Sequence, residues 1–100
     1  MGMTLEEVLR IVEGKAISAD VDLQTDVKMA CGADLMSDVL AFTHAGTILL
    51  TGLTNPQVVR TAEITGIQAI IFVRGKYPPQ ETIALAREKG IPLLASRHTM

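Results

Sequence analysis

The stretch TILLTGLTNPQVVRTAEITGI, residues 47–67, decides the fold class of this chain of 100 residues. It begins with a continuous apolar run, a pattern typical of parallel strands that are covered on both faces. The run breaks at Thr51 and Gly52, and a helical pattern then starts at Pro56 and ends at Gly66. Proline suits the first position of a helix, and glycine suits the residue after its end. The stretch therefore predicts a buried parallel strand, a turn and a helix.

The same layout returns in AIIFVRGKYPPQETIALAREKG, residues 69–90, before a third apolar run at residues 91–95. Gly75 follows Gly52 by 23 residues, and the prolines that open the two helical patterns have the same spacing. We interpret this as two βα units closed by a third strand, a parallel βαβαβ segment over residues 47–96 with right-handed crossovers. The echo reflects either a duplication or the similar caps of any two βα units, and the sequence leaves both open.

A helix is expected near the N-terminus, in TLEEVLRIVEG, residues 4–14. Thr4 and Glu7 fit a capping box, in which a hydroxyl and a carboxylate accept hydrogen bonds from free backbone N–H groups at a helix start. Gly14 is the expected end of this helix, because glycine readily adopts the left-handed conformation found there.

Two further strands and another helix complete the predicted domain. Residues 17–23 and 27–31 alternate between apolar and polar, which predicts half-buried strands that can pair with one another. Residues 32–46 have a helical pattern in which Asp34 is the candidate N-cap. The whole chain, residues 1–100, is therefore predicted to form a single small α/β domain.

The composition excludes several classes of partner. A formal net charge of -2 lacks the positive footprint expected for binding nucleic acid or an anionic membrane surface. No apolar run approaches the roughly 18–20 residues of a membrane span, and the acidic N-terminal stretch does not resemble a signal peptide. The single cysteine, Cys31, fits a reducing compartment. We expect a cytoplasmic protein whose small core favours oligomerisation.

Candidate ligand-binding residues lie in three loops. Ligands of parallel sheets bind beyond the carboxyl ends of the strands, where this chain places TGLTNP, RGKYPP and SRHT. Free N–H groups after Pro56 and the positive end of the helix dipole would favour an anion there. The candidates in these loops are Thr51, Gly52, Thr54, Asn55, Arg74, Lys76, Ser96 and Thr99.

Each of these candidates has a plainer alternative. Gly52 can serve only a tight turn, Asn55 can serve only as a helix cap, and Arg74 and Lys76 can be solvated charges. Neither G-x-x-x-x-G-K-[ST] nor G-x-G-x-x-G occurs in the chain. The loops therefore predict a candidate phosphate pocket without a nucleotide-binding fingerprint.

Catalysis and metal binding have weaker support in the sequence. Asp34 and Asp38, four residues apart, can share a helix face for acid–base chemistry or a metal, or can simply favour the helix start. His98 has no nearby carboxylate or cysteine partner and is interpreted as a surface residue. CxxC and HExxH are absent, and no nucleophile and base are assembled by a local motif. No catalytic residue, metal or cofactor is predicted.

The segments ADLMSDVLAF, TILLTGLTNPQVVRTAE, IIFVRGKYP and GIPLL together resemble the DRTGG domain family over roughly residues 4–99. The resemblance aligns Asp34 with the signature Asp, which adds Asp34 to the candidate ligand-binding residues, and it aligns Thr51 and Gly52 with the signature Thr-Gly. The signature Arg is missing, and Leu53 stands where a second Gly is common. Any ligand role tied to that Arg is therefore in doubt for this chain, which is either a short member or a truncated one that stops at Met100.

The resemblance implies a non-catalytic regulatory or ligand-sensing domain that forms homodimers. Such domains accompany CBS domains or stand alone beside iron hydrogenase genes, and are similar to the N-terminal domain of HPr kinase/phosphorylase. With the polar loops, this implies binding of a small phosphorylated or nucleotide-like anion at the sheet edge. The alternative is a purely structural interaction module for a partner enzyme such as an iron hydrogenase. A small phosphotransfer enzyme using Asp34 or His98 is the third hypothesis.

Overall fold

The computed structural model describes residues 3–17, 24, 26–27, 29–32 and 47–97. Its helices and strands follow the predicted order in the C-terminal half and are shorter in the N-terminal half. They are β1 (Met3–Thr4), α1 (Leu5–Ile11), β2 (Lys15–Ala16), β3 (Asp26–Val27), β4 (Met29–Gly32), β5 (Thr47–Thr51), α3 (Pro56–Thr65), β6 (Ala69–Phe72), α4 (Gln80–Lys89) and β7 (Leu93–Ala95).

Five strands form the main sheet in the order β2-β7-β6-β5-β4. The four strands from β7 to β4 are parallel, and β2 adds an antiparallel edge by pairing Lys15 with Ala95. Strands β1 and β3 form a separate antiparallel pair. The arrangement confirms the predicted α/β fold and its βαβαβ segment, here β5-α3-β6-α4-β7.

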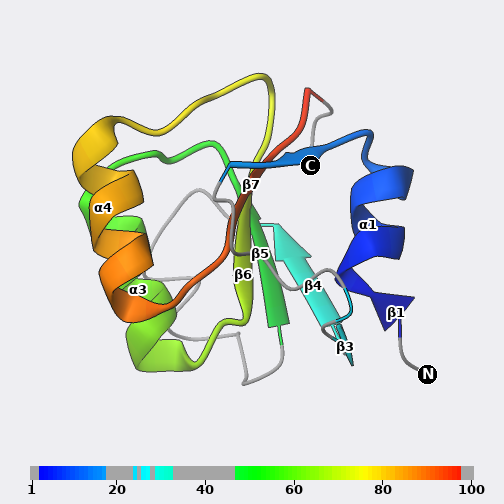
Figure 1. The fold of residues 1–100 in the computed structure, drawn as a ribbon, viewed down its shortest axis with the longest axis horizontal. Helices are drawn as coiled ribbons and strands as arrows, with labels where there is room; N and C mark the ends of the chain where they lie inside the picture. The colour runs from blue at the N-terminus through cyan, green and yellow to red at the C-terminus, as the bar shows by residue number, and fades with distance from the viewer. Residues whose placement is uncertain (1–2, 18–23, 25, 28, 33–46, 98–100) are drawn as a thin grey trace.

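The sheet is covered on both faces, as the continuous apolar runs predict. Helices α3 and α4 lie on one face and α1 on the other (Figure 1). Along β6, Ile70 and Phe72 face the cluster under α3 and α4, whereas Ala69, Ile71 and Val73 face the cluster under α1. The period of two along a strand sends alternate side chains to opposite faces, so every residue of β6 is buried.

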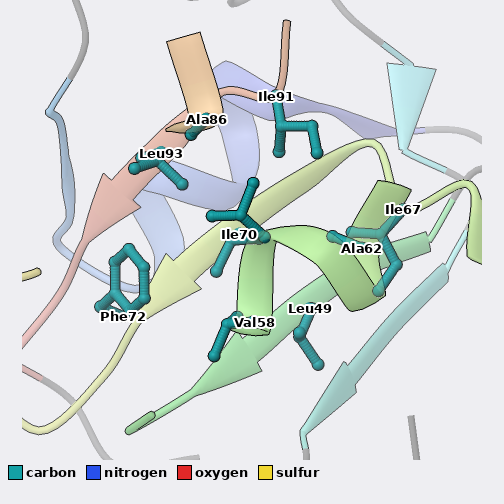
Figure 2. Packing of buried hydrophobic residues seen from close by; sticks show 10 residues of the cluster. Leu49, Val58, Ala62, Ile67, Ile70, Phe72, Ala86, Ile91 and Leu93 are labelled. Carbon is teal, nitrogen blue, oxygen red and sulfur yellow. The ribbon is translucent and has the colours of Figure 1, made fainter. Parts of the chain in front are cut away.

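The larger cluster, under α3 and α4, fixes these helices on the sheet. Val58 and Ala62 of α3, Ala86 of α4 and Leu49 of β5 converge around Ile70 (Figure 2). Each is at most 1% exposed. Burial of one such aliphatic side chain stabilises the fold by about 1.5–3 kcal/mol, which makes this cluster the anchor for the loops that leave the sheet.

Helix α1 begins as predicted, with Thr4 and Glu7 forming a capping box. The Oγ1 atom of Thr4 accepts from the Glu7 N–H at 3.3 Å, and Oε1 of Glu7 accepts from the Thr4 N–H at 3.0 Å. These hydrogen bonds, chiefly the one from the Thr4 backbone, lower the pKa of Glu7 because they favour the carboxylate.

The end of α1 differs from the prediction. Glu13, with φ of 53°, takes the left-handed conformation, and the Gly14 N–H donates to the Leu9 carbonyl at 2.8 Å. Gly14 is needed for another reason, because a Cβ atom there would lie 2.7 Å from the backbone oxygen of Ala95. Its lack of a side chain lets the turn after α1 approach β7 closely.

Helices α3 and α4 end in the same way as each other, at the glycines that the sequence indicated. Gly66 has φ of 75° and Gly90 has φ of 71°. The N–H groups of Ile67 and Ile91 then donate back to Ala62 and Ala86 at 3.0 and 2.9 Å. Each pair also belongs to the larger apolar cluster, so the Gly-Ile step both ends a helix and leads into the core.

The starts of α3 and α4 correct two details. Asn55 occupies the N-cap position of α3 with extended backbone, but its side chain makes no capping hydrogen bond. Pro56 is the first residue of α3, as predicted, whereas Pro79 is the N-cap of α4 and Gln80 is its first residue. The two prolines that match in the sequence therefore hold different positions.

The strand predicted to begin at residue 17 is wrong at its start. The observed strand β2 is Lys15–Ala16, which pairs with β7 and ends before residue 17. The predicted strand 27–31 is split between β3 and β4, and β4 pairs with β5 in parallel. Residues 18–23 and the expected helix within 33–46 lie outside the described residues. In the part of the chain that the structure describes, no helix is long and apolar enough to cross a membrane.

Candidate functional site

The loops after β5, β6 and β7 emerge at the same edge of the sheet because these strands are parallel neighbours. Backbone hydrogen bonds continue beyond the strands and hold the loops together. The Val73 N–H donates to Thr51 at 3.0 Å, the Ser96 N–H to Phe72 at 2.8 Å, and the Gly75 N–H to Ser96 at 3.1 Å. The three loops thus share one rigid base.

The first loop, after β5, uses its polar groups internally. Thr51 is fully buried, and its Oγ1 accepts from the Leu53 N–H at 3.1 Å. The carbonyl of Thr54 accepts from Oγ1 of Thr82, a buried residue of α4, at 2.7 Å. The Thr51 hydroxyl therefore stabilises the turn, and the Thr54 carbonyl joins the turn to α4.

Gly52 in this loop makes room for an arginine. Its φ is not in the left-handed region, so a tight turn is not what requires glycine there. A Cβ atom at Gly52 would lie 1.9 Å from Nη2 of Arg74, which places the guanidinium directly against the backbone of the first loop. The positive charge of Arg74 therefore lies at the end of β5, although Arg74 belongs to the second loop. Asn55, another residue of the first loop, is exposed.

The second loop, after β6, begins with a tight turn. Arg74 and Gly75 have φ of 60° and 71°, and the Lys76 N–H donates to the Val73 carbonyl at 3.2 Å. Two consecutive positive φ values with this hydrogen bond are typical of a type I′ turn. The turn sends Arg74 toward β5 and leaves Lys76 and Tyr77 exposed on the other side.

A pocket of about 550 Å³ lies beside this second loop. Its volume is within the range of small-molecule sites, about 300–1,000 Å³. The turn after α1, the start of the second loop and the end of β7 form its walls, and these segments gather at one end of the molecule (Figure 1). The lining residues are Glu13, Gly14, Lys15, Gly75, Lys76, Tyr77, Ala95, Ser96 and Arg97.

The antiparallel edge strand explains how α1 contributes to this pocket. Pairing of Lys15 with Ala95 brings the turn after α1 beside the carboxyl end of β7. Ser96, only 4% exposed, then donates from its Oγ to the Val12 carbonyl at 2.5 Å. The Ser96 hydrogen bond therefore holds the end of β7 against the turn after α1. Lys15 lines the pocket because β2 pairs with β7, and the loops of the parallel strands alone would not supply this residue.

The pocket is electropositive. Lys15, Lys76 and Arg97 are exposed and line it together with one carboxylate, Glu13. Two ion pairs elsewhere in the described residues join Arg10 to Glu6 and Lys89 to Glu63. Three cations against one carboxylate stand out in a chain whose net charge is -2. Such a concave cationic site concentrates anions.

The predicted site residues thus fall into two groups. Thr51, Gly52, Thr54 and Asn55 belong to the first loop and do not line the pocket, whereas Lys76 and Ser96 do. Arg74 connects the two groups. Asp34, Asp38, His98 and Thr99 lie outside the described residues. Among the residues that are described, no group of three His, Cys, Asp or Glu side chains could hold a metal ion.

Sequence reasoning missed Glu13, Lys15 and Tyr77, and it placed Arg97 in the loop SRHT without making it a candidate. Lys15 could not be found from the loops of the parallel strands because its position depends on the pairing of β2 with β7. Tyr77 stood in the quoted loop RGKYPP, so its aromatic ring next to Lys76 was a usable signal. The sequence contained no signal for Glu13, because residue propensities place a left-handed conformation at Gly14 and not at the glutamate before it.

Comparison with known proteins identifies the domain. Residues 7–100 match the DRTGG domain. A solved structure with the same fold contains the CBS and DRTGG domains of the regulatory region of Clostridium perfringens pyrophosphatase, complexed with its activator, diadenosine tetraphosphate. The TM-score is 0.75 at 18% sequence identity.

The alignment covers 96% of this chain but 42% of the pyrophosphatase chain, so the similarity concerns part of that regulatory region. No curated protein sequence matches significantly. The family match extends over nearly the whole chain and agrees with the observed fold. The chain therefore belongs to the DRTGG domain family.

Proposed function

We propose that this protein is a non-catalytic ligand-sensing domain that binds a small phosphorylated or nucleotide-like anion at the carboxyl edge of β5, β6 and β7. The observation that carries the proposal is the pocket in which Lys15, Lys76 and Arg97 converge from three separate segments. Cations held around a concavity attract phosphate oxygens and can donate charge-assisted hydrogen bonds to them.

The related fold gives independent support for sensing rather than turnover. The pyrophosphatase fragment that shares the fold is a regulatory region bound to a nucleotide activator. In this chain, the described pocket side chains comprise two lysines, an arginine, a tyrosine, a glutamate and a serine whose hydroxyl donates to a backbone carbonyl. These groups suit anion binding, and they do not form a nucleophile activated by an adjacent base.

Calorimetric titration with ATP and with acetyl phosphate tests the proposal. We expect saturable binding of at least one of these anions, and a rise in the melting temperature with its concentration, because a ligand of the folded state stabilises it. Absence of both heat and a thermal shift at millimolar concentrations of either anion would contradict the binding proposal.

Formation of a homodimer and binding to a partner enzyme remain predictions, and the geometry of the pocket does not bear on either. Analytical ultracentrifugation of the full chain measures the first directly, with a dimer expected. A pull-down with a purified iron hydrogenase measures the second. A complex that forms equally well with the pocket cations replaced would favour the structural interaction module over the sensor.

A further inference from the structure

We propose that the pocket beside the second loop is a nucleoside polyphosphate site, in which Lys15, Lys76 and Arg97 bind the phosphate chain and Tyr77 stacks on the base. This inference rests on the proposed anion-binding function and names the ligand class and the residues that select it. It also places the ligand beside β6 and β7, not at the Thr51-Gly52 turn.

The number and origin of the cations favour more than one phosphate group. Lys15 comes from β2, Lys76 from the second loop, and Arg97 from the segment after β7. Each enters the pocket wall independently, so the positive charge is distributed around the cavity. The volume of about 550 Å³ is within the range of sites for whole small molecules, about 300–1,000 Å³, which is more than a single phosphate group requires.

Tyr77 supplies an aromatic ring on which a nucleobase can stack. It lines the pocket and is 61% exposed, so a face of its ring is accessible. Pro78 follows it and is buried, which restricts the backbone of Tyr77 to extended conformations. A ring presented from a restricted backbone loses less entropy on binding, and stacking on a nucleobase is not selective for the base.

Backbone geometry around the pocket points the same way. Among the described residues, Glu13 and Arg74 are the non-glycine residues with positive φ. Glu13 lines the pocket, and Arg74 immediately precedes Gly75, which also lines it. Left-handed conformations are uncommon for non-glycine residues, and such residues cluster at ligand sites.

Calorimetry with three probes, namely ATP, AMP and inorganic tripolyphosphate, tests this assignment on the full chain. We expect ATP to bind at least about tenfold more tightly than AMP, because AMP engages fewer of the three cations. Each single change Lys15→Ala, Lys76→Ala or Arg97→Ala should weaken ATP binding about five- to tenfold.

A matched control keeps the net charge change equal. The variant Lys15→Ala/Lys76→Ala/Arg97→Ala removes three cations, as does Arg60→Ala/Arg87→Ala/Lys89→Ala on the exposed surface of α3 and α4. The first variant should lose binding of ATP and tripolyphosphate, and the second should retain both. Circular dichroism and thermal melting confirm that both variants fold.

Tyr77 separates base from phosphate recognition. Tyr77→Ala should weaken ATP binding at least about fivefold and leave tripolyphosphate binding unchanged, whereas Tyr77→Phe should bind ATP like the wild type. Equal affinities for AMP and ATP, or equal loss in the two triple variants, would overturn the assignment. If acetyl phosphate binds but ATP does not, this inference fails and the proposed function stands. Loss of all binding by every probe contradicts both.

Discussion

The two βα turns of this domain share a glycine at the same place in the repeat, yet the two glycines serve different ends. Gly52 leaves room for the Arg74 guanidinium, which occupies the space that a side chain would fill. Gly75 has open space around its missing Cβ and is required because its φ is +71°. In the first turn, glycine leaves space for a packed side chain; in the second turn, glycine allows a left-handed backbone conformation.

The two turns also differ in their relation to the pocket. The first turn engages Thr51, Thr54 and Gly52 in contacts within the protein, so its resemblance to a phosphate loop is only local. The second turn is tighter and carries Lys76 and Tyr77 into the wall of a pocket. A repeated pattern in the sequence therefore predicts repeated elements, but it does not predict which copy lines a pocket.

The largest expected effect comes from breaking the hydrogen bond that joins the first turn to α4. Thr82→Val removes the hydroxyl that donates to the Thr54 carbonyl and keeps the side-chain shape. We expect the free energy of unfolding to fall by about 1–2 kcal/mol, because the carbonyl loses its partner in a partly buried place. Urea denaturation measures the change.

Thr65→Val is the matched control, since Oγ1 of Thr65 donates to the Thr61 carbonyl within α3 itself. Its cost should stay within about 0.5 kcal/mol, as is usual outside long-range contacts. Equal costs for the two substitutions would show that the first turn does not depend on α4.

Alanine at each glycine tests the two roles directly. Gly75→Ala should cost about 1 kcal/mol, because alanine in the left-handed region is strained and the loss of chain entropy in the unfolded state offsets only part of that strain. Gly52→Ala should change the stability by less than about 0.5 kcal/mol, since only the end of a flexible side chain must move away. The melting curves of the two variants provide the comparison.

The double variant Gly52→Ala/Arg74→Ala sharpens this result. With the guanidinium gone, the alanine at position 52 should show no residual cost, so the two substitutions should be non-additive. A cost for Gly52→Ala that persists in the double variant would mean that the backbone, and not Arg74, requires glycine there.

The smallest effect concerns α1, whose start is capped by side chains, in contrast to α3 and α4, where no side-chain cap bond is present. The pKa of Glu7 is lowered from its ordinary value of 4.5 by the hydrogen bonds from Thr4. Its contribution to stability is therefore present above pH 4.5 and is lost as the pH falls through the lowered pKa.

Thermal melting between about pH 3 and pH 6 measures this contribution. The wild type should lose slightly more stability on acidification than Glu7→Gln, in which the titrating group is absent. The same slope in both proteins would show that the capping box carries no pH-dependent stability.

Much of the fold follows from local patterns. The apolar runs at β5, β6 and β7 and the Gly-Ile steps at 66–67 and 90–91 indicate the elements because burial on both faces and helix ends are local requirements. The position of β2 does not follow, because Lys15–Ala16 is too short to show a period and is a strand only through its pairing with β7. Pairing of an edge strand is a long-range choice that local patterns do not encode.

The candidate site was predictable to the same extent. The carboxyl edge and Lys76 follow from the parallel topology. The inward use of Thr51 and the contribution of Lys15 do not, because each depends on contacts with distant segments. Sequence reasoning therefore identified the edge of the sheet but not the contribution of β2 to the pocket.

The most direct test of this account is an amide NMR titration of the full chain, labelled with nitrogen-15, with ATP. We predict that the largest chemical-shift changes fall on Glu13–Lys15, Gly75–Tyr77 and Ala95–Arg97, which line the pocket. The residues of the first turn, Gly52 to Gln57, should shift little. Large changes confined to the first turn, with the pocket residues unmoved, would contradict the central claim that the second turn forms the ligand site.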